Sequence, residues 1–201
     1  GGLITSGANN VLIGQSAASE LTTGTDNIAI GYDALNAATT GDLNIAIGSS
    51  AASALTGNNN LVLGYSAMNT ATSATDNIAM GSSAASALTT GTNNIILGTG
   101  SGSGLTTGTY NIVIGSSAGS LDTGSSSILV GRAANAASGA SNVISIGSTF
   151  DVAANYVSVG NAASVGLRLG SSAGIASSGS AAIGEFYLLS ESTGAVYLRL
   201  S

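Results

Sequence analysis

The side chains of this sequence best suited to acid–base or metal chemistry are its carboxylates. The chain has no histidine, cysteine or lysine. It therefore lacks an imidazole base, a thiolate, a Schiff-base amine and an ordinary zinc ligand set. The carboxylates are Glu20, Asp26, Asp33, Asp42, Asp76, Asp122, Asp151, Glu185 and Glu191.

Asp26 and Asp76 occupy the same position of a sequence repeat and are expected on one face. Leu43 and Asn59 fill that position in the units between them, so no close pair for two-carboxylate hydrolysis follows. Calcium needs several converging oxygens, and the Gly-Gly-x-Gly-x-Asp repeat that supplies them in other β-rolls is missing. We therefore predict no catalytic, metal-binding or cofactor-binding residue, and a protein that is not an enzyme.

Two other features resemble binding sites. Residues 98–102 (Gly-Thr-Gly-Ser-Gly) suggest a phosphate loop, but the lysine and the following helix are missing, so we expect an ordinary loop. Tyr32 and Tyr65 each follow a repeat glycine. They either stack on sugars of a host glycan or cover a neighbour's backbone, and we favour the second alternative.

Composition excludes several classes of protein. A net charge of −6 with three arginines argues against nucleic acid. Disorder is excluded because 44% of the residues are hydrophobic and the large ones are periodic. Every apolar cluster is interrupted well before the roughly 18 residues of a membrane span, so we expect no membrane insertion. Without cysteine, disulfides cannot stabilise the fold.

The chain is organised around a short repeat. Residues 27–31 (Asn-Ile-Ala-Ile-Gly) return in close form at 44–48, 77–81, 94–98 and 111–115. Looser copies end at Gly14, Gly64, Gly131 and Gly147, and the closing glycines are 16 or 17 residues apart. So short a period predicts one small unit stacked on itself.

Each unit contains a predicted three-residue strand before its closing glycine. Its first and third residues are large and apolar and share a face, which we predict to be the internal core. The middle residue should then lie on the outer face, and the outer face of a lone solenoid should be polar. Yet eight of the nine middle residues are apolar: Leu12, Ala29, Ala46, Val62, Ala79, Ile96, Val113 and Leu129, with Ser145 the exception. We predict that copies of the chain bury this face at the axis of a homo-oligomer; the alternative is an exposed apolar stripe.

The rest of the unit predicts corners and turns. The closing glycine suits a positive φ, and the small residue three positions later, such as Ala34 or Ala67, predicts a second short strand. Leu-Thr-Thr-Gly, as at 21–24, predicts a turn. Asn27 and its counterparts at the strand entrance are expected to form a hydrogen-bonded ladder from coil to coil, and Asn is also common in turns.

These observations predict an all-β fold, a parallel β-solenoid of about nine coils over residues 1–147. With about 4.8 Å between strands, the rod is on the order of 40 Å long. Residues 148–184 predict shorter-period coils, because the glycines at 160, 170 and 184 follow at closer spacing. Residues 185–201 predict a β-hairpin. We expect the sequence to be a piece of a longer protein with a further domain downstream.

The segments ending at Gly31 and Gly48, each followed by a small-Ala element, resemble the head repeats of trimeric autotransporter adhesins. That resemblance implies a trimeric, left-handed β-roll, although the family's unit is shorter and lacks the Leu-Thr-Thr-Gly segment. Long repeats of this kind are also similar to those of bacteriophage tail fibres. The hairpin from Phe186 to Leu198 resembles short hairpins of phage tail proteins.

The leading hypothesis is a structural shaft of a virion tail fibre. It would be extracellular, homotrimeric, joined to other virion tail proteins, and would present a tip to a host-surface glycan or protein. The first alternative is a trimeric adhesin on a bacterial surface. The second is an ice-binding solenoid, since threonine pairs recur at residues 22–23, 39–40, 89–90 and 106–107, although the row breaks at Gly57, Ser73 and Asp122.

Overall fold

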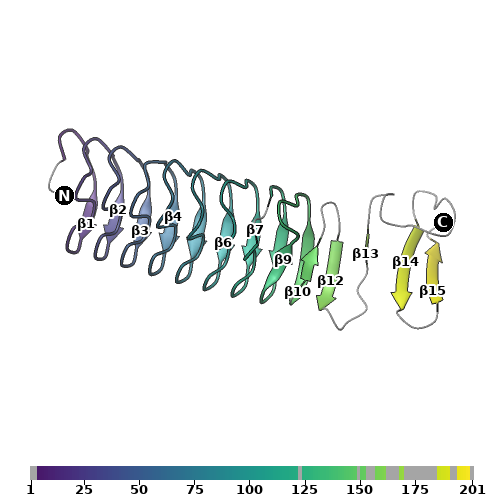
Figure 1. Cartoon of the computed structure of the whole chain (residues 1–201). Helices are drawn as coiled ribbons and strands as arrows, with labels where there is room; N and C mark the ends of the chain where they lie inside the picture. The colour runs from purple at the N-terminus through teal and green to yellow at the C-terminus, as the bar shows by residue number, and fades with distance from the viewer. Residues whose placement is uncertain are drawn as a thin grey trace.

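The repeat region is a row of narrow coils stacked along one direction (Figure 1). The computed structural model describes residues 4–121, 124–148, 150–152, 157–161, 168–169, 185–190 and 194–199, with side chains in 4–121 and 124–147. Each coil contributes one strand to a common sheet. These strands are β1 (Val11–Ile13), β2 (Ile28–Ile30), β3 (Ile45–Ile47), β4 (Leu61–Leu63), β5 (Ile78–Met80), β6 (Ile95–Leu97), β7 (Ile112–Ile114), β8 (Ile128–Val130) and β10 (Ile144–Ser148).

Strands of neighbouring coils pair in parallel and in register. Between β2 and β3, Ile28 lies opposite Ile45 and Ala29 opposite Ala46. Equivalent residues pair in the same way at every step from β1 to β8 and from β8 to β10. The predicted β-solenoid is confirmed: nine strands, one before each closing glycine, bound about eight turns.

The two faces of the sheet are the reverse of what we predicted. The middle residues Ala29, Val62, Ile96 and Leu129 are fully buried inside their own coil. The first and third residues of the strands lie outside; Ile13, for example, is 56% exposed. The prediction that copies of the chain cover the middle residues at an oligomer axis is therefore wrong, because the chain buries those residues itself.

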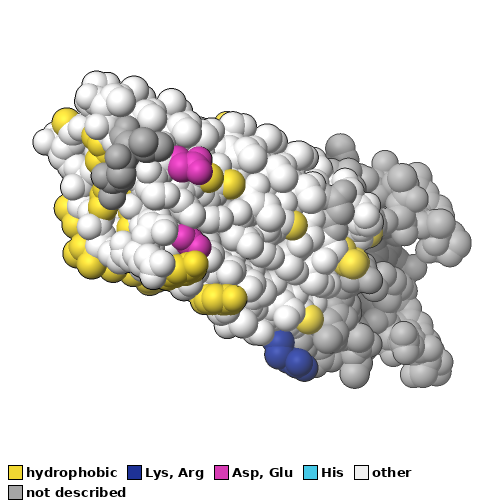
Figure 2. Space-filling view, turned by 60° about the vertical axis from the view of Figure 1, so that its left-hand side comes forward, with side chains coloured by type: hydrophobic (Ala, Val, Ile, Leu, Met, Phe, Trp, Pro, Cys, Tyr) yellow, Lys and Arg dark blue, Asp and Glu magenta, His cyan; other side chains and the backbone are white. Residues whose placement is uncertain are grey.

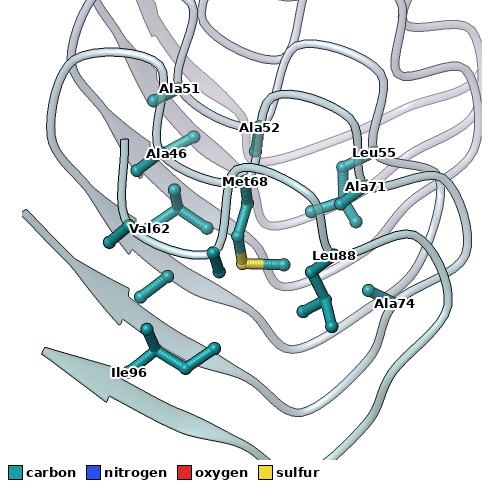
Figure 3. Packing of buried hydrophobic residues seen from close by; sticks show 14 of the residues in the cluster. Ala46, Ala51, Ala52, Leu55, Val62, Met68, Ala71, Ala74, Leu88 and Ile96 are labelled. Atoms are coloured by element: carbon teal, nitrogen blue, oxygen red, sulfur yellow. The ribbon is translucent and has the colours of Figure 1, made fainter. Parts of the chain in front are cut away.

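The wall of the coil opposite the strand explains why the inner and outer faces of the strands are reversed. It points a large side chain inward in most coils, and Figure 3 shows Met68 and Leu88 directed into the interior that Val62 and Ile96 enter from the strands. Burial of one such side chain contributes about 1.5–3 kcal/mol. A narrow coil that already holds this residue has room for one strand side chain but not for two, so the single middle residue points inward and the two flanking residues point outward.

The position of the large residue on that wall alternates from coil to coil. Two wall positions, three residues apart, carry one small and one large side chain, and all of these are at most 2% exposed. Stacked coils therefore interdigitate while each keeps a similar interior volume. The pairs in chain order are Ala18 with Leu21, Leu35 with Ala38, Ala52 with Leu55, Met68 with Ala71, and Ala85 with Leu88.

The second short strand predicted after each closing glycine is absent from the first seven coils. Alternate residues there have positive φ, such as Asp33 (55°) and Leu35 (50°), and this geometry excludes an extended strand. The backbone still bonds from coil to coil, for example from Leu35 N–H to the Ala51 carbonyl at 3.1 Å. A strand forms at this place only as β9 (Ala134–Ala136), which pairs in parallel with β11 (Phe150–Val152).

The closing glycines adopt the positive φ that we predicted. Gly31 has φ 137°, and a Cβ added to it would lie 2.5 Å from the Gly48 carbonyl oxygen of the next coil. Any larger residue would collide with backbone. These positions therefore require glycine both for conformation and for the spacing between coils.

Beyond Gly147 the main sheet gains one more parallel strand. β12 (Val157–Asn161) pairs in parallel with β10, whereas β13 (Arg168–Leu169) pairs with β12 in the antiparallel sense. β14 (Glu185–Ser190) and β15 (Gly194–Arg199) form the predicted hairpin, which is confirmed. Two of the glycines that suggested shorter coils, Gly170 and Gly184, lie outside the described residues.

Coil six tests the packing rule directly. A Cβ added to Gly102 would lie 3.0 Å from Cγ2 of Ile96, the largest β-branched middle residue. We expect Gly102→Ala to cost about 1–3 kcal/mol by overpacking. In the background of Ile96→Ala, which recreates the Ala79 and Ala85 pair of coil five, the overpacking should disappear and the same change should cost only the strain of an alanine at φ 65°.

Chemical denaturation of the four proteins of this double-mutant cycle measures the coupling between the two sites. Equal costs of Gly102→Ala in both backgrounds would contradict direct packing of these residues across the coil.

Candidate interaction surface

Three of the described carboxylates, Asp26, Asp33 and Asp42, accept hydrogen bonds from neighbouring residues of the scaffold. Asp42 Oδ1 accepts hydrogen bonds from the backbone N–H and hydroxyl of Thr25, at 2.7 and 3.1 Å. Asp26 Oδ1 accepts from Asn9 Nδ2 at 3.0 Å, also across coils. Asp26 and Asp76 are exposed at equivalent positions, as predicted, and lie three coils apart, or about 14 Å.

No group of three or more potential metal ligands occurs within the described residues. Asp122 and Glu191 lie outside them, and the side chains of Asp151 and Glu185 are not described.

The glycine-rich segment 98–102 is a turn of the coil. Gly98 is its closing corner, and Gly100 and Gly102 have φ of 62° and 65°. Ser83 and Ala85, at the equivalent positions of the preceding coil, have similar φ angles of 54° and 52°. The segment therefore repeats the scaffold, with glycine leaving room for Ile96.

The predicted asparagine ladder is confirmed. Asn77 is fully buried, and its Oδ1 accepts from the backbone N–H and from Nδ2 of Asn94, both at 3.0 Å. Its Nδ2 donates to the Gly91 carbonyl at 2.9 Å and to Asn60 Oδ1 at 3.1 Å. The ladder residues are Asn10, Asn27, Asn44, Asn60, Asn77, Asn94 and Asn111, and Ser127 takes the next place.

One row of threonines also bonds along the rod. The hydroxyl of Thr22 donates to the Thr39 carbonyl at 2.9 Å, and that of Thr89 donates to the Thr106 carbonyl at 3.1 Å. Thr56 and Thr72 each make the equivalent bond to the next coil. These hydroxyls are committed to the next coil and do not form a free outward array.

The outer face of the sheet carries two long apolar rows. Its two outer rows are the first and third residues of each strand, and Figure 2 shows hydrophobic side chains gathered along one edge of the rod. The first row is Val11, Ile28, Ile45, Leu61, Ile78, Ile95, Ile112, Ile128 and Ile144. The second row is Ile13, Ile30, Ile47, Leu63, Met80, Leu97, Ile114, Val130 and Ile146.

Aromatic and aliphatic side chains stand beyond the strand ends on both sides of these rows. Tyr32 and Tyr65, two residues after the second row, are 52% and 62% exposed. Leu43 and Tyr110, two residues before the first row, are 55% and 64% exposed. Tyr32 and Tyr65 thus keep more than half of their surface accessible in the single chain.

We missed this face because both sides of the strands are apolar in sequence. The available signal was the leucine of Leu-Thr-Thr-Gly, as in Leu21 and Leu88, together with Leu35 and Met68. Those large residues needed burial inside the coil and left no room there for two more large side chains per strand.

Comparison with protein-family models, with curated proteins and with solved structures finds no match to this chain. Across the part of the chain that the structure describes, no helix has the length and apolarity to cross a membrane.

The ladder makes a testable contribution to stability. In Asn77→Asp, an oxygen replaces the amide that faces the Gly91 carbonyl and Asn60 Oδ1. We expect a loss of about 1–3 kcal/mol for each buried group left without its partner, measured by denaturant unfolding at pH 7.

The loss should also depend on pH. Burial raises the pKa of the introduced carboxyl in the folded protein above its unfolded value of roughly 3.9. The variant therefore loses stability as the pH rises from that unfolded pKa towards the higher pKa of the folded state. Asn93→Asp, at the exposed neighbouring position, is the matched control and should remain near wild type. Equal effects of the two variants would contradict a stabilising ladder.

Proposed function

We propose that this chain is a structural shaft of a virion tail fibre that acts without catalysis. The observation that carries the proposal is the uninterrupted hydrogen bonding between coils, through the sheet, the turn side and the buried asparagines. A rod in which every coil is bonded on several sides to the next resists bending and local opening. Those properties suit a spacer that holds a recognition tip away from a particle.

The proposed fibre is extracellular and homotrimeric, and it joins other tail proteins of the virion. The resemblance of the repeats to trimeric adhesin heads and to phage fibres supports this assignment. Host contact, with a surface glycan or protein, belongs to the tip in this proposal.

Antibodies raised against the repeat region test the location of the protein. In immunogold electron microscopy of cultures that produce this protein, the label should lie on slender fibres of virus particles. Label on the surface of intact cells in particle-free cultures would instead support the bacterial adhesin, which relies on the same stacking. Preimmune serum provides the control.

Ice binding is the less favoured alternative. The hydroxyls of Thr22, Thr56, Thr72 and Thr89 are engaged with the next coil, which leaves no regular outward hydroxyl row at that position. We expect a thermal-hysteresis assay to give no activity above that of a control protein at equal concentration. Measurable hysteresis would contradict the shaft assignment.

A further inference from the structure

The two outer rows form a long apolar surface without a charged residue in either row. Eight steps of about 4.8 Å make the surface about 38 Å long, and the rows lie about 7 Å apart. With the width of the side chains, the rows cover about 500 Å², at the upper end of the apolar patches that monomers expose. Several row side chains are exposed in the single chain, by 45% at Val11, 38% at Leu63 and 41% at Ile146, and most of the others are partly buried.

The surroundings of the rows have the composition of an interface rim. Tyr32, Tyr65, Leu43 and Tyr110 stand beyond the strand ends, among serines and asparagines. When these bordering positions are included, the surface reaches about 800 Å², the area that each partner buries in a typical stable complex. An apolar centre with a polar rim is also the usual anatomy of such a complex, and aromatic residues are enriched in it.

We propose that another copy of this chain covers the outer rows, with the copies parallel and in register. Backbone hydrogen bonds fix the spacing of the apolar ridges, and a second copy has ridges of the same spacing over the same length. A differently built protein would need to match that spacing over eight steps. The 16- and 17-residue coils do not disturb the match, because the strands stay in register at every step.

This inference deepens the proposed shaft and relies on it only for the direction of the copies. In a fibre, all chains point the same way, so equivalent coils meet at the same height. Two or three chains can satisfy this arrangement, since each brings one linear surface to a common axis. The identity of the tail fibre itself is tested separately by the immunogold experiment.

Single cysteines measure the direction of the copies, because the chain has no cysteine of its own. Met80→Cys lies in β5, the middle of the nine strands, and Ile13→Cys lies in β1 at the end of the row. Parallel, in-register copies bring both positions close to their own counterparts. Antiparallel copies bring only the central position close to its counterpart.

The experiment combines solution mass with disulfide formation under mild oxidation. We expect a mass of two or three chains, and covalent dimers on non-reducing gels with both cysteine variants. Cross-linking by Met80→Cys alone would overturn the parallel arrangement while leaving self-association intact. A single-chain mass across the micromolar range would overturn the whole inference, and flotation of such single chains with lipid vesicles would assign the surface to a membrane.

A charge variant identifies the surface responsible. Leu63→Glu combined with Ile95→Glu places charges on the outer rows two coils apart, and we expect single chains with wild-type circular dichroism. The matched control is Thr40→Glu combined with Thr90→Glu, at exposed turn positions three repeats apart, which should keep the wild-type mass. Persistence of the oligomer in a folded outer-row variant would overturn the inference, and the cysteine variants test it if that variant fails to fold.

Discussion

Every residue of the repeat lies next to its own counterpart in the following coil, at the spacing of a β-sheet. This constraint decides which residues each position tolerates. At the closing glycines the next backbone is so near that a Cβ on Gly64 would lie 2.3 Å from the Gly81 carbonyl oxygen. At the strand entrance, asparagine suits the stack because its amide both donates and accepts, so identical residues satisfy one another.

The interior obeys the same constraint through volume. Inward side chains stack on the side chains of adjacent coils, so a large residue cannot occur at every inward position. Alternation of Leu35 with Ala52 and Met68 with Ala85 distributes the large residues along the rod. Where this alternation stops, Ile96 fills the interior from the strand side and Gly102 makes room opposite. Each coil therefore buries only a few side chains, and the core is continuous because the coils stack.

Sequence reasoning could predict what depends on period and residue type. The spacing of the glycines determined the coils, the parallel strands and their register, and Asn27 with its counterparts predicted the ladder. Alternation within a strand shows that Ile28 and Ile30 share a face and that Ala29 lies on the other. It does not say which face is inside when both are apolar.

The turn side escaped prediction for a different reason. Asp33 and Leu35 adopt positive φ, a region that non-glycine residues rarely enter. Aspartate enters it more readily than most residues, but the leucine side chain gives no such indication. Bonds to the coils above and below stabilise that backbone, and such tertiary support is not visible in a local sequence pattern. Ser145 differs from the other middle residues because it is polar, and its buried hydroxyl oxygen has no hydrogen-bond partner.

The orientation of the short strands decides which of their residues form the core and which form the outer rows. The proposed assembly of copies depends on that orientation. A crystal or electron cryomicroscopy structure of the assembled protein tests that orientation most directly. We predict Ala29, Val62 and Leu129 inside each coil, and Ile30, Leu63 and Val130 in contact with a neighbouring copy near a shared axis. Density that places Ile30, Leu63 and Val130 inside their own coils, or that leaves them facing bulk water in an assembled particle, would contradict the account.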